Sequence, residues 1–118
     1  MTPDITADAP IVDCHAHVYT TDMPLSATAW HKPPADATIE QYVAILDRHG
    51  VQYAVLAAAS LFDDYNEYSI EATRRHKRLR TTAIVKPTMD PYVMRMMKDD
   101  GVVGVRFQWR NVKDLPDI

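Results

Sequence analysis

Residues 11–19 read IVDCHAHVY, an apolar run in which three polar side chains occur at every second position. Side chains alternate between the two faces of a β-strand, so a strand over residues 11–18 places Asp13, His15 and His17 on one face. The small apolar residues between them share the other face, where they can pack beneath helices. In a closed parallel barrel the face with Asp13, His15 and His17 would point into the barrel, and His17 would lie nearest the C-terminal rim, where such barrels place their chemistry.

The two histidines are spaced so that they could share an ion. Residues at i and i+2 of a strand are about 7 Å apart at Cα, and the ring nitrogens of His15 and His17 could converge on one cation at ~2.0–2.1 Å each. Asp13 lies one layer deeper and could accept a ring N–H, which would fix a histidine tautomer. The alternative is a pair of structural histidines in a polar cavity. We expect a functional site, and the spacing leaves metal binding open.

Apolar runs alternate with amphipathic stretches along the rest of the chain. Thr38 and Gln41 have the spacing of a helix capping box, and Gly50 and Gly101 are suited to end helices. Strands that alternate with helices favour a parallel sheet. The pattern predicts strands over 11–18, 53–59, 82–85 and 102–107, and helices over 38–49, 67–75 and 91–100.

The composition is that of one globular domain, with 118 residues of which 47% are hydrophobic and 25% charged. A net charge of -3 gives no sign of a nucleic-acid or membrane surface, and no run approaches the ~20 apolar residues of a membrane span. The single cysteine, Cys14, is expected to be a small buried residue facing away from the histidines. Residues 1–10 lack the apolar core of a signal peptide, so we expect a disordered lead-in and a cytoplasmic location.

The motif DCHAHV on a first strand resembles the opening of the amidohydrolase superfamily. It is most similar to the amidohydrolase-related (amidohydrolase 2) branch, which contains 2-pyrone-4,6-dicarboxylate lactonase, sulfomuconolactone hydrolase and sugar lactonases. Later signals follow in the branch's order: a second strand ending in the serine of AAAS, a third ending in proline, and GVVGVRF, which is similar to Gly-x-x-Gly-x-Arg-Phe. The resemblance covers residues 11–107. It departs at Tyr65-Asn66, where the branch commonly has Asp-Asn, and at Lys86, where it often has an acidic residue.

The resemblance implies an α/β fold, the TIM-type (β/α)8 barrel, which normally needs about 250 residues. This chain would supply about the first four strands. We therefore expect residues 1–118 to form a single partial domain, with residues 11–118 as the N-terminal half of the barrel. In the superfamily, later strands supply further histidines and an aspartate that acts as general base. The chain alone is expected to be incomplete and inactive.

Arg106 lies near the end of the fourth predicted strand, where a buried charge is costly unless it is paired. We expect it to anchor a substrate carboxylate, because the planar guanidinium makes bidentate contacts. The alternative is an internal salt bridge with an acidic residue such as Asp13. Ser60 and Asn66 follow the second strand and could hydrogen-bond substrate or cap the loop. Lys86 ends the third strand and could bind an anion or be solvated.

The resemblance implies a hydrolase that opens a lactone ring of a small carboxylate with activated water, and His15 and His17 as its catalytic residues on this chain. The same two histidines would ligate a divalent metal, zinc or manganese, and metal-independent chemistry stays open. No organic cofactor is expected. The alternatives are a metal-dependent decarboxylase of the same superfamily and a non-catalytic half-barrel that assembles with other copies. The expected partner is the small-molecule substrate, with a homo-oligomer left open.

Overall fold

The computed structural model describes residues 9–109, 113 and 114, so most of the expected lead-in over residues 1–10 lies outside the described residues. The predicted order of strands and helices is confirmed, with an additional short 3₁₀ helix after the second strand. The elements are β1 (Val12–Ala16), α1 (Ile39–Arg48), β2 (Tyr53–Leu56), η1 (Ser60–Phe62), α2 (Glu67–Arg75), β3 (Leu79–Ile84), α3 (Pro91–Asp99) and β4 (Val102–Arg106).

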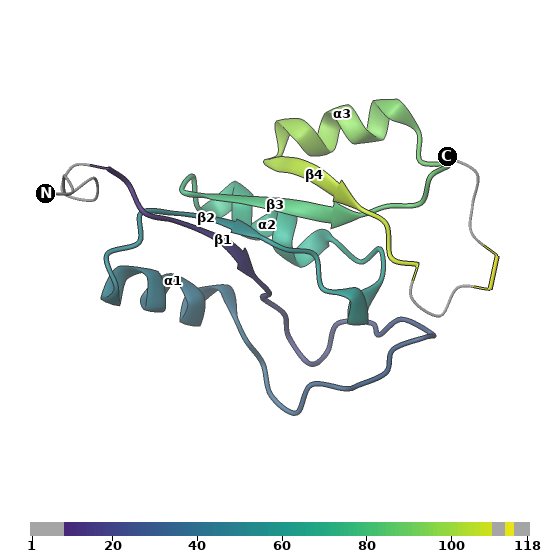
Figure 1. The fold of residues 1–118 in the computed structure, drawn as a ribbon, viewed down its shortest axis with the longest axis horizontal. Helices are drawn as coiled ribbons and strands as arrows, with labels where there is room; N and C mark the ends of the chain where they lie inside the picture. Colours follow the sequence, from purple (N-terminus) through teal and green to yellow (C-terminus); the bar gives the residue numbers. More distant parts are fainter. Residues whose placement is uncertain (1–8, 110–112, 115–118) are drawn as a thin grey trace, which may run out of the picture.

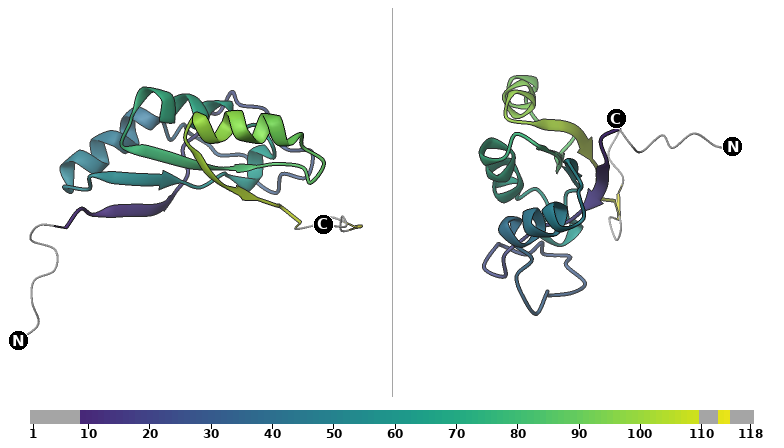
Figure 2. Two further views of the ribbon diagram at one scale, coloured as in Figure 1. Left: turned by 90° about the horizontal axis from the view of Figure 1, so that it is seen from above. Right: turned by 90° about the vertical axis from the view of Figure 1, so that its left-hand side faces the viewer.

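The four strands form one parallel sheet in the order β1-β2-β3-β4. The three α-helices lie along one side of the curved sheet (Figures 1 and 2). This is the arrangement of four consecutive strands of a (β/α)8 barrel, in which the helices lie outside. We call the sheet face without helices the open face. It carries the strand residues that alternate with the core: Val55, Thr82 and Arg106.

The helix boundaries follow from the local sequence. Thr38 and Gln41 form the predicted capping box at the start of α1, and Gly50 after that helix has a φ of 67°. The Asp90 side chain accepts a hydrogen bond from the Tyr92 N–H at the start of α3. Gly101, which follows α3, has a φ of 111°. Only glycine adopts the φ of Gly101 without strain. The predicted helix ends at Gly50 and Gly101 are both confirmed.

The core lies between the sheet and the helices. One cluster of buried residues joins β2, β3 and the segment just after β1 to α1 and α2, and a smaller one lies between β3 and β4, beneath α3. The first cluster is Val18, Ile39, Leu46, Ala54, Leu56, Ala72 and Leu79. The second is Ala83, Val85 and Val102, with Ile70, Met89, Met97 and Phe107 packed against it. Because the described core is on the helix side, polar groups can occupy the open face.

Two expectations are corrected. β3 begins at Leu79 instead of residue 82, because Leu79 pairs with Ala54 and is fully buried while Arg80 points outward. Cys14 is exposed and not buried. It lies on β1, which has a neighbouring strand on one side only among the described residues.

Among the described residues, the helices are too short and too polar for any of them to cross a bilayer. The long loop between β1 and α1 is closed at its base by two backbone hydrogen bonds between Tyr19 and Ala37, of 2.8 and 3.0 Å. This closure holds the loop beside the C-terminal end of β1, which is the end that carries the histidines.

Candidate active site

His15 and His17 lie together at the C-terminal end of β1. Their rings form an edge-to-face pair with centroids 5.1 Å apart and planes at 85°. Both side chains are exposed. The two rings therefore meet on one side of the chain as predicted, although β1 ends at Ala16 and His17 lies just beyond the strand. The C-terminal ends of the strands are where (β/α)8 barrels carry their chemistry.

Asp13 does not share that face, because β1 contains a β-bulge. Asp13 pairs with Ala54 and Ala16 pairs with Leu56, so three steps on β1 match two steps on β2. Ala54 and Leu56 both belong to the core beneath the helices. Paired residues of neighbouring strands point to the same face, so Asp13 also points to the helix side. The histidines flank Ala16 and point to the open face.

The Asp13 carboxylate has partners other than the predicted histidine ring. Its Oδ2 accepts a hydrogen bond of 2.5 Å from the Tyr42 hydroxyl on α1. Its Oδ1 accepts one of 3.1 Å from the backbone N–H of His15. Burial of Tyr42, together with the hydrogen bond to Asp13, raises the pKa of the phenol well above its usual range. The sequence pattern did not predict a polar role for Tyr42, because this residue also fits the apolar stripe of α1.

A backbone carbonyl fixes the proton on the His17 ring. Nδ1 of His17 lies 2.8 Å from the carbonyl oxygen of Ala57, just after β2. A carbonyl oxygen only accepts hydrogen bonds, so Nδ1 carries the proton in this contact. In the neutral ring the lone pair is then on Nε2. No hydrogen bond to that nitrogen is found among the described residues, so it can act as a base or ligate a metal ion.

Arg106 reaches across the open face from β4 to the end of β2. Its Nη1 donates a hydrogen bond of 2.6 Å to the Ala58 carbonyl, and its Nη2 donates one of 3.3 Å to Oε1 of Gln108. No carboxylate among the described residues forms an ion pair with it. The alternative of a salt bridge to Asp13 is wrong, since Asp13 points to the helix side. The half-buried guanidinium keeps further N–H donors for a ligand.

Asn66 ties the loop after β2 to the end of β3. Its Nδ2 donates hydrogen bonds to the carbonyls of Ile84 (2.9 Å) and Asp64 (3.0 Å). Its Oδ1 accepts a hydrogen bond of 3.1 Å from the Ile84 N–H. Both amide hydrogens are therefore engaged with the backbone, and one oxygen lone pair remains.

Ser60 and Lys86 lie at the same end of the sheet. The second strand, predicted over 53–59, ends at Leu56, so Ser60 does not follow it directly; it begins η1 and is half-buried. Lys86 is exposed, and its Nζ lies 3.9 Å from Oδ2 of Asp64. A cleft of about 170 Å³ lies between the residues that follow β3, including Lys86, and the residues that follow β4. Its lining includes Ile84, Lys86, Phe107, Trp109 and the two acidic residues Asp63 and Asp64.

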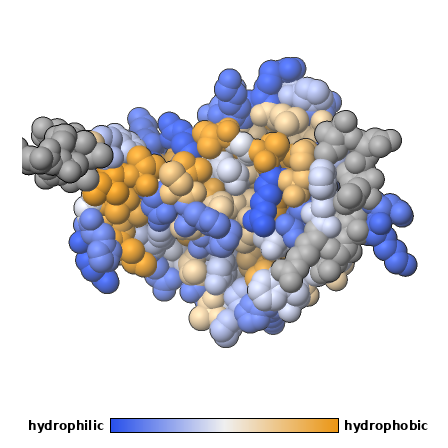
Figure 3. Space-filling model, viewed as in Figure 1, coloured by the Kyte–Doolittle hydropathy of each residue, from blue (hydrophilic) through white to orange (hydrophobic). Residues whose placement is uncertain are grey.

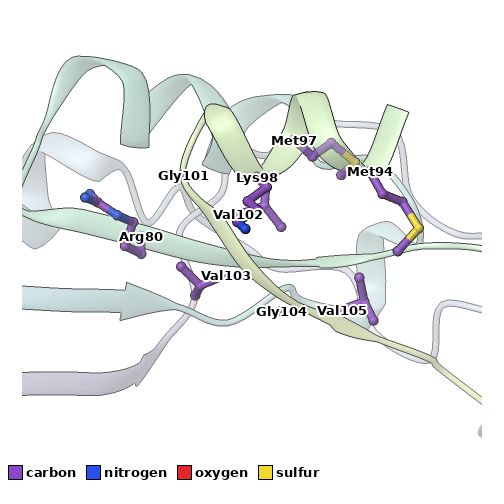
Figure 4. A pocket seen from close by; sticks show the side chains of 9 residues that line it. All are labelled: Arg80, Met94, Met97, Lys98, Gly101, Val102, Val103, Gly104 and Val105. Atoms are coloured by element: carbon purple, nitrogen blue, oxygen red, sulfur yellow. The ribbon is translucent and has the colours of Figure 1, made fainter. Parts of the chain in front are cut away.

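A larger groove of about 380 Å³ lies at the outer edge of the sheet, between α3 and β4 (Figure 4). Met94 and Met97 of α3 and Val103 and Val105 of β4 line it. None of the predicted site residues contacts this groove. Its position beside β4 separates it from the end of β1, where the histidines lie.

The described residues contain no group of three or more histidine, cysteine, aspartate or glutamate side chains that could hold a metal ion. His15 and His17 could supply two ligands. The donor types and the free Nε2 of His17 fit zinc or manganese, which bind imidazole nitrogen. Any complete metal site would need further ligands from beyond this group.

Residues 12–116 match the model of a protein family described as Amidohydrolase. A 4-sulfomuconolactone hydrolase from Rhizobium radiobacter is 33% identical over 99 residues, which are 80% of this chain and 32% of that protein. The crystal structure of a probable 2-pyrone-4,6-dicarboxylic acid hydrolase from Acinetobacter baumannii, with citric acid bound, is 30% identical with a TM-score of 0.81. The match covers 84% of this chain and 38% of the chain in that crystal structure.

A candidate 2-pyrone-4,6-dicarboxylic acid hydrolase from Pseudomonas putida has a TM-score of 0.73 and 27% identity, over 81% of this chain and 36% of its own. The predicted fold, the first strands of a TIM-type (β/α)8 barrel, is thereby confirmed. The chain spans about a third of the length of each of these three relatives.

Proposed function

This chain belongs to the amidohydrolase family, and from that premise we propose that it is part of a hydrolase that opens the lactone ring of a small anionic substrate. The relatives named above are hydrolases whose names specify a sulfonated lactone or a pyrone dicarboxylate. Both are rings closed by an ester bond that carry anionic groups.

One observation supports the proposal more than any other. His17 follows β1 and Arg106 ends β4, at opposite edges of the described sheet, yet they bond to the carbonyls of adjacent residues, Ala57 and Ala58. A substrate at the end of β2 could therefore present its ester carbonyl to the histidines and its anionic group to Arg106. Holding two substrate groups at once fixes the orientation of the ring for attack by water.

In the proposed reaction, water adds to the lactone carbonyl carbon and the ring C–O bond breaks. The products are a carboxylate and a hydroxyl group on one open chain. His15 and His17 would stabilise the charge that develops on the carbonyl oxygen, either directly or by holding a divalent cation. Such a cation would polarise the carbonyl and lower the pKa of a bound water. The general base would come from outside this chain, so the chain alone is inactive.

The remaining site residues have smaller proposed roles. Lys86 and Ser60 would contact the substrate at the rim, where Lys86 adds positive charge beside the cleft with Trp109. Asn66 would contact the substrate only through its remaining oxygen lone pair. Its larger role is to hold the loop that carries Ser60 against β3.

The test uses the full-length gene product, with its metal content measured by mass spectrometry. Ring opening of 2-pyrone-4,6-dicarboxylate and 4-sulfomuconolactone is followed by the loss of absorbance of the ring. We expect turnover of at least one of them. His17→Gln should lower kcat by a hundredfold or more, on the order of the contribution of one acid–base or charge-stabilising group.

His49→Gln is the matched control, because His49 is an exposed histidine at the C-terminal end of α1. It should keep wild-type kcat. Release of carbon dioxide without ring opening would instead support the decarboxylase. Wild-type activity in His17→Gln would contradict the proposed site.

A further inference from the structure

We propose that Asp13 and Tyr42 are positioning residues that hold the β1 bulge, and that this bulge turns His15 and His17 onto the open face. The functional half of this inference rests on the proposed function. Its structural half does not.

The register of β1 against β2 sets the face to which each side chain of β1 points. With regular alternation from Asp13, which points to the helix side, His15 and His17 would point to the helix side as well. The extra residue of the bulge reverses the faces beyond Asp13. β-Bulges are frequent beside active sites because they re-aim side chains in this way.

A bulge leaves some backbone groups without hydrogen-bond partners on the neighbouring strand. The Asp13 carboxylate supplies the partner for one such group. The backbone N–H of His15 donates to Asp13 Oδ1 at 3.1 Å, two residues along the chain, which is the local contact that aspartate makes in turns. The second oxygen is held by the Tyr42 hydroxyl at 2.5 Å. Tyr42 packs against the core cluster on α1, so the carboxylate is fixed to the helix layer.

This arrangement links the helix layer to the histidine pair. The His17 ring reaches the Ala57 carbonyl only while Ala16 stays paired with Leu56, one residue earlier on each strand. Without the Asp13 contacts, the bulge competes with regular pairing, in which His17 loses this carbonyl. Asp13 thus acts on the histidines through the backbone and not through a ring N–H.

The test measures the His17 ring directly in the full-length protein labelled with ¹⁵N-histidine. Long-range ¹H–¹⁵N spectra distinguish a proton on Nδ1 from one on Nε2. The wild type should show the Nδ1–H form for His17. Tyr42→Phe, Asp13→Asn and Asp13→Ala should increasingly lose it. On the proposed lactone substrate, kcat should fall by roughly ten- to a hundredfold with KM little changed, as for other residues that orient a ligand side chain.

Tyr68→Phe is the matched control. The Tyr68 hydroxyl accepts a hydrogen bond of 3.0 Å from the Ile39 N–H, and the Tyr68 side chain packs against the same core cluster as Tyr42. This hydrogen bond does not involve a side chain of β1. It should cost similar stability and leave the His17 spectrum and kcat unchanged.

If neither lactone is turned over, the proposed function fails while the His17 spectra still decide this inference. It is overturned if Tyr42→Phe and Asp13→Asn both keep the Nδ1–H form, or if Tyr68→Phe changes the spectrum as much as Tyr42→Phe. Should Asp13→Ala not fold, the two milder variants carry the test.

Discussion

Two neighbouring backbone carbonyls hold the two candidate site residues that come from opposite edges of the sheet. Ala57 binds the ring of His17 and Ala58 binds the guanidinium of Arg106. Neither alanine has a polar side chain, so the sequence gives no hint of this role. At the scale of single residues, the site depends on where the chain leaves β2 as much as on the side chains themselves.

Arg106→Lys tests the role of the guanidinium. Lysine keeps the charge but has one ammonium group, which cannot bond the Ala58 carbonyl and hold an anionic group as a planar fork does. We expect KM for the lactone to rise about tenfold, equivalent to ~1.4 kcal/mol, with kcat changed less. Steady-state kinetics of the full-length protein measure this.

The control for Arg106→Lys is Arg48→Lys, an exposed arginine in the last turn of α1. It should leave both constants unchanged. A fall in kcat with KM unchanged in Arg106→Lys would argue against substrate anchoring.

At the scale of elements, the turn from α3 into β4 permits little variation. Gly101 has a φ of 111°, and a Cβ added there would lie 3.0 Å from both Cβ and Oγ1 of Thr73 on α2. Oγ1 of Thr73 lies 2.7 Å from the carbonyl oxygens of both Ile70 and Asp100, which share its single proton, so the hydroxyl cannot move without losing this contact. This glycine brings α2, α3 and β4 together.

Gly101→Ala should destabilise the fold more than Gly50→Ala. At Gly50 the φ is 67° and an added Cβ would meet nothing within 4 Å. The loss in the free energy of unfolding there comes only from the left-handed backbone conformation and is roughly 1–2 kcal/mol. At Gly101 the clash with Thr73 adds roughly 1–3 kcal/mol. Urea unfolding of both variants measures the difference. Equal losses would show that Thr73 gives way without cost.

At the scale of the whole molecule, the sheet has two open edges among the described residues, at β1 and β4. Exposed hydrophobic residues gather over the start of β1 and beside β4 (Figure 3). They include Ile11 and Val12 at one edge and Val103 and Val105 at the other. Unpaired parallel edges with apolar side chains favour pairing with another chain.

We predict that the 118-residue chain, expressed alone, self-associates with increasing concentration in analytical ultracentrifugation. Val103→Lys with Val105→Lys should weaken the association, because the charges must be desolvated at the paired edge. The matched control is Tyr92→Lys with Met96→Lys, two exposed apolar residues on α3.

A chain that stays monomeric at every concentration would contradict this prediction. A dimer of defined size would favour the half-barrel assembly module over a simple part of a longer enzyme.

The sequence alone determined the order of the strands and helices, the helix ends at Gly50 and Gly101, and the pairing of His15 with His17. Each of these depends on contacts a few residues apart, through strand alternation, helical periodicity and capping. The resemblance to the amidohydrolase superfamily could also be recognised from the sequence, because the motifs of that superfamily occur in order along the chain.

Tertiary structure alone decided which way Asp13 points, which proton the His17 ring carries and what holds Arg106. The bulge in β1 is set by pairing with β2, and Tyr42 and Ala57 are 29 and 40 residues away from the side chains they bind. Strand alternation is a rule for regular pairing and cannot reveal an inserted residue. The faces of a bulged strand are fixed only when its neighbour and the helix above it are in place.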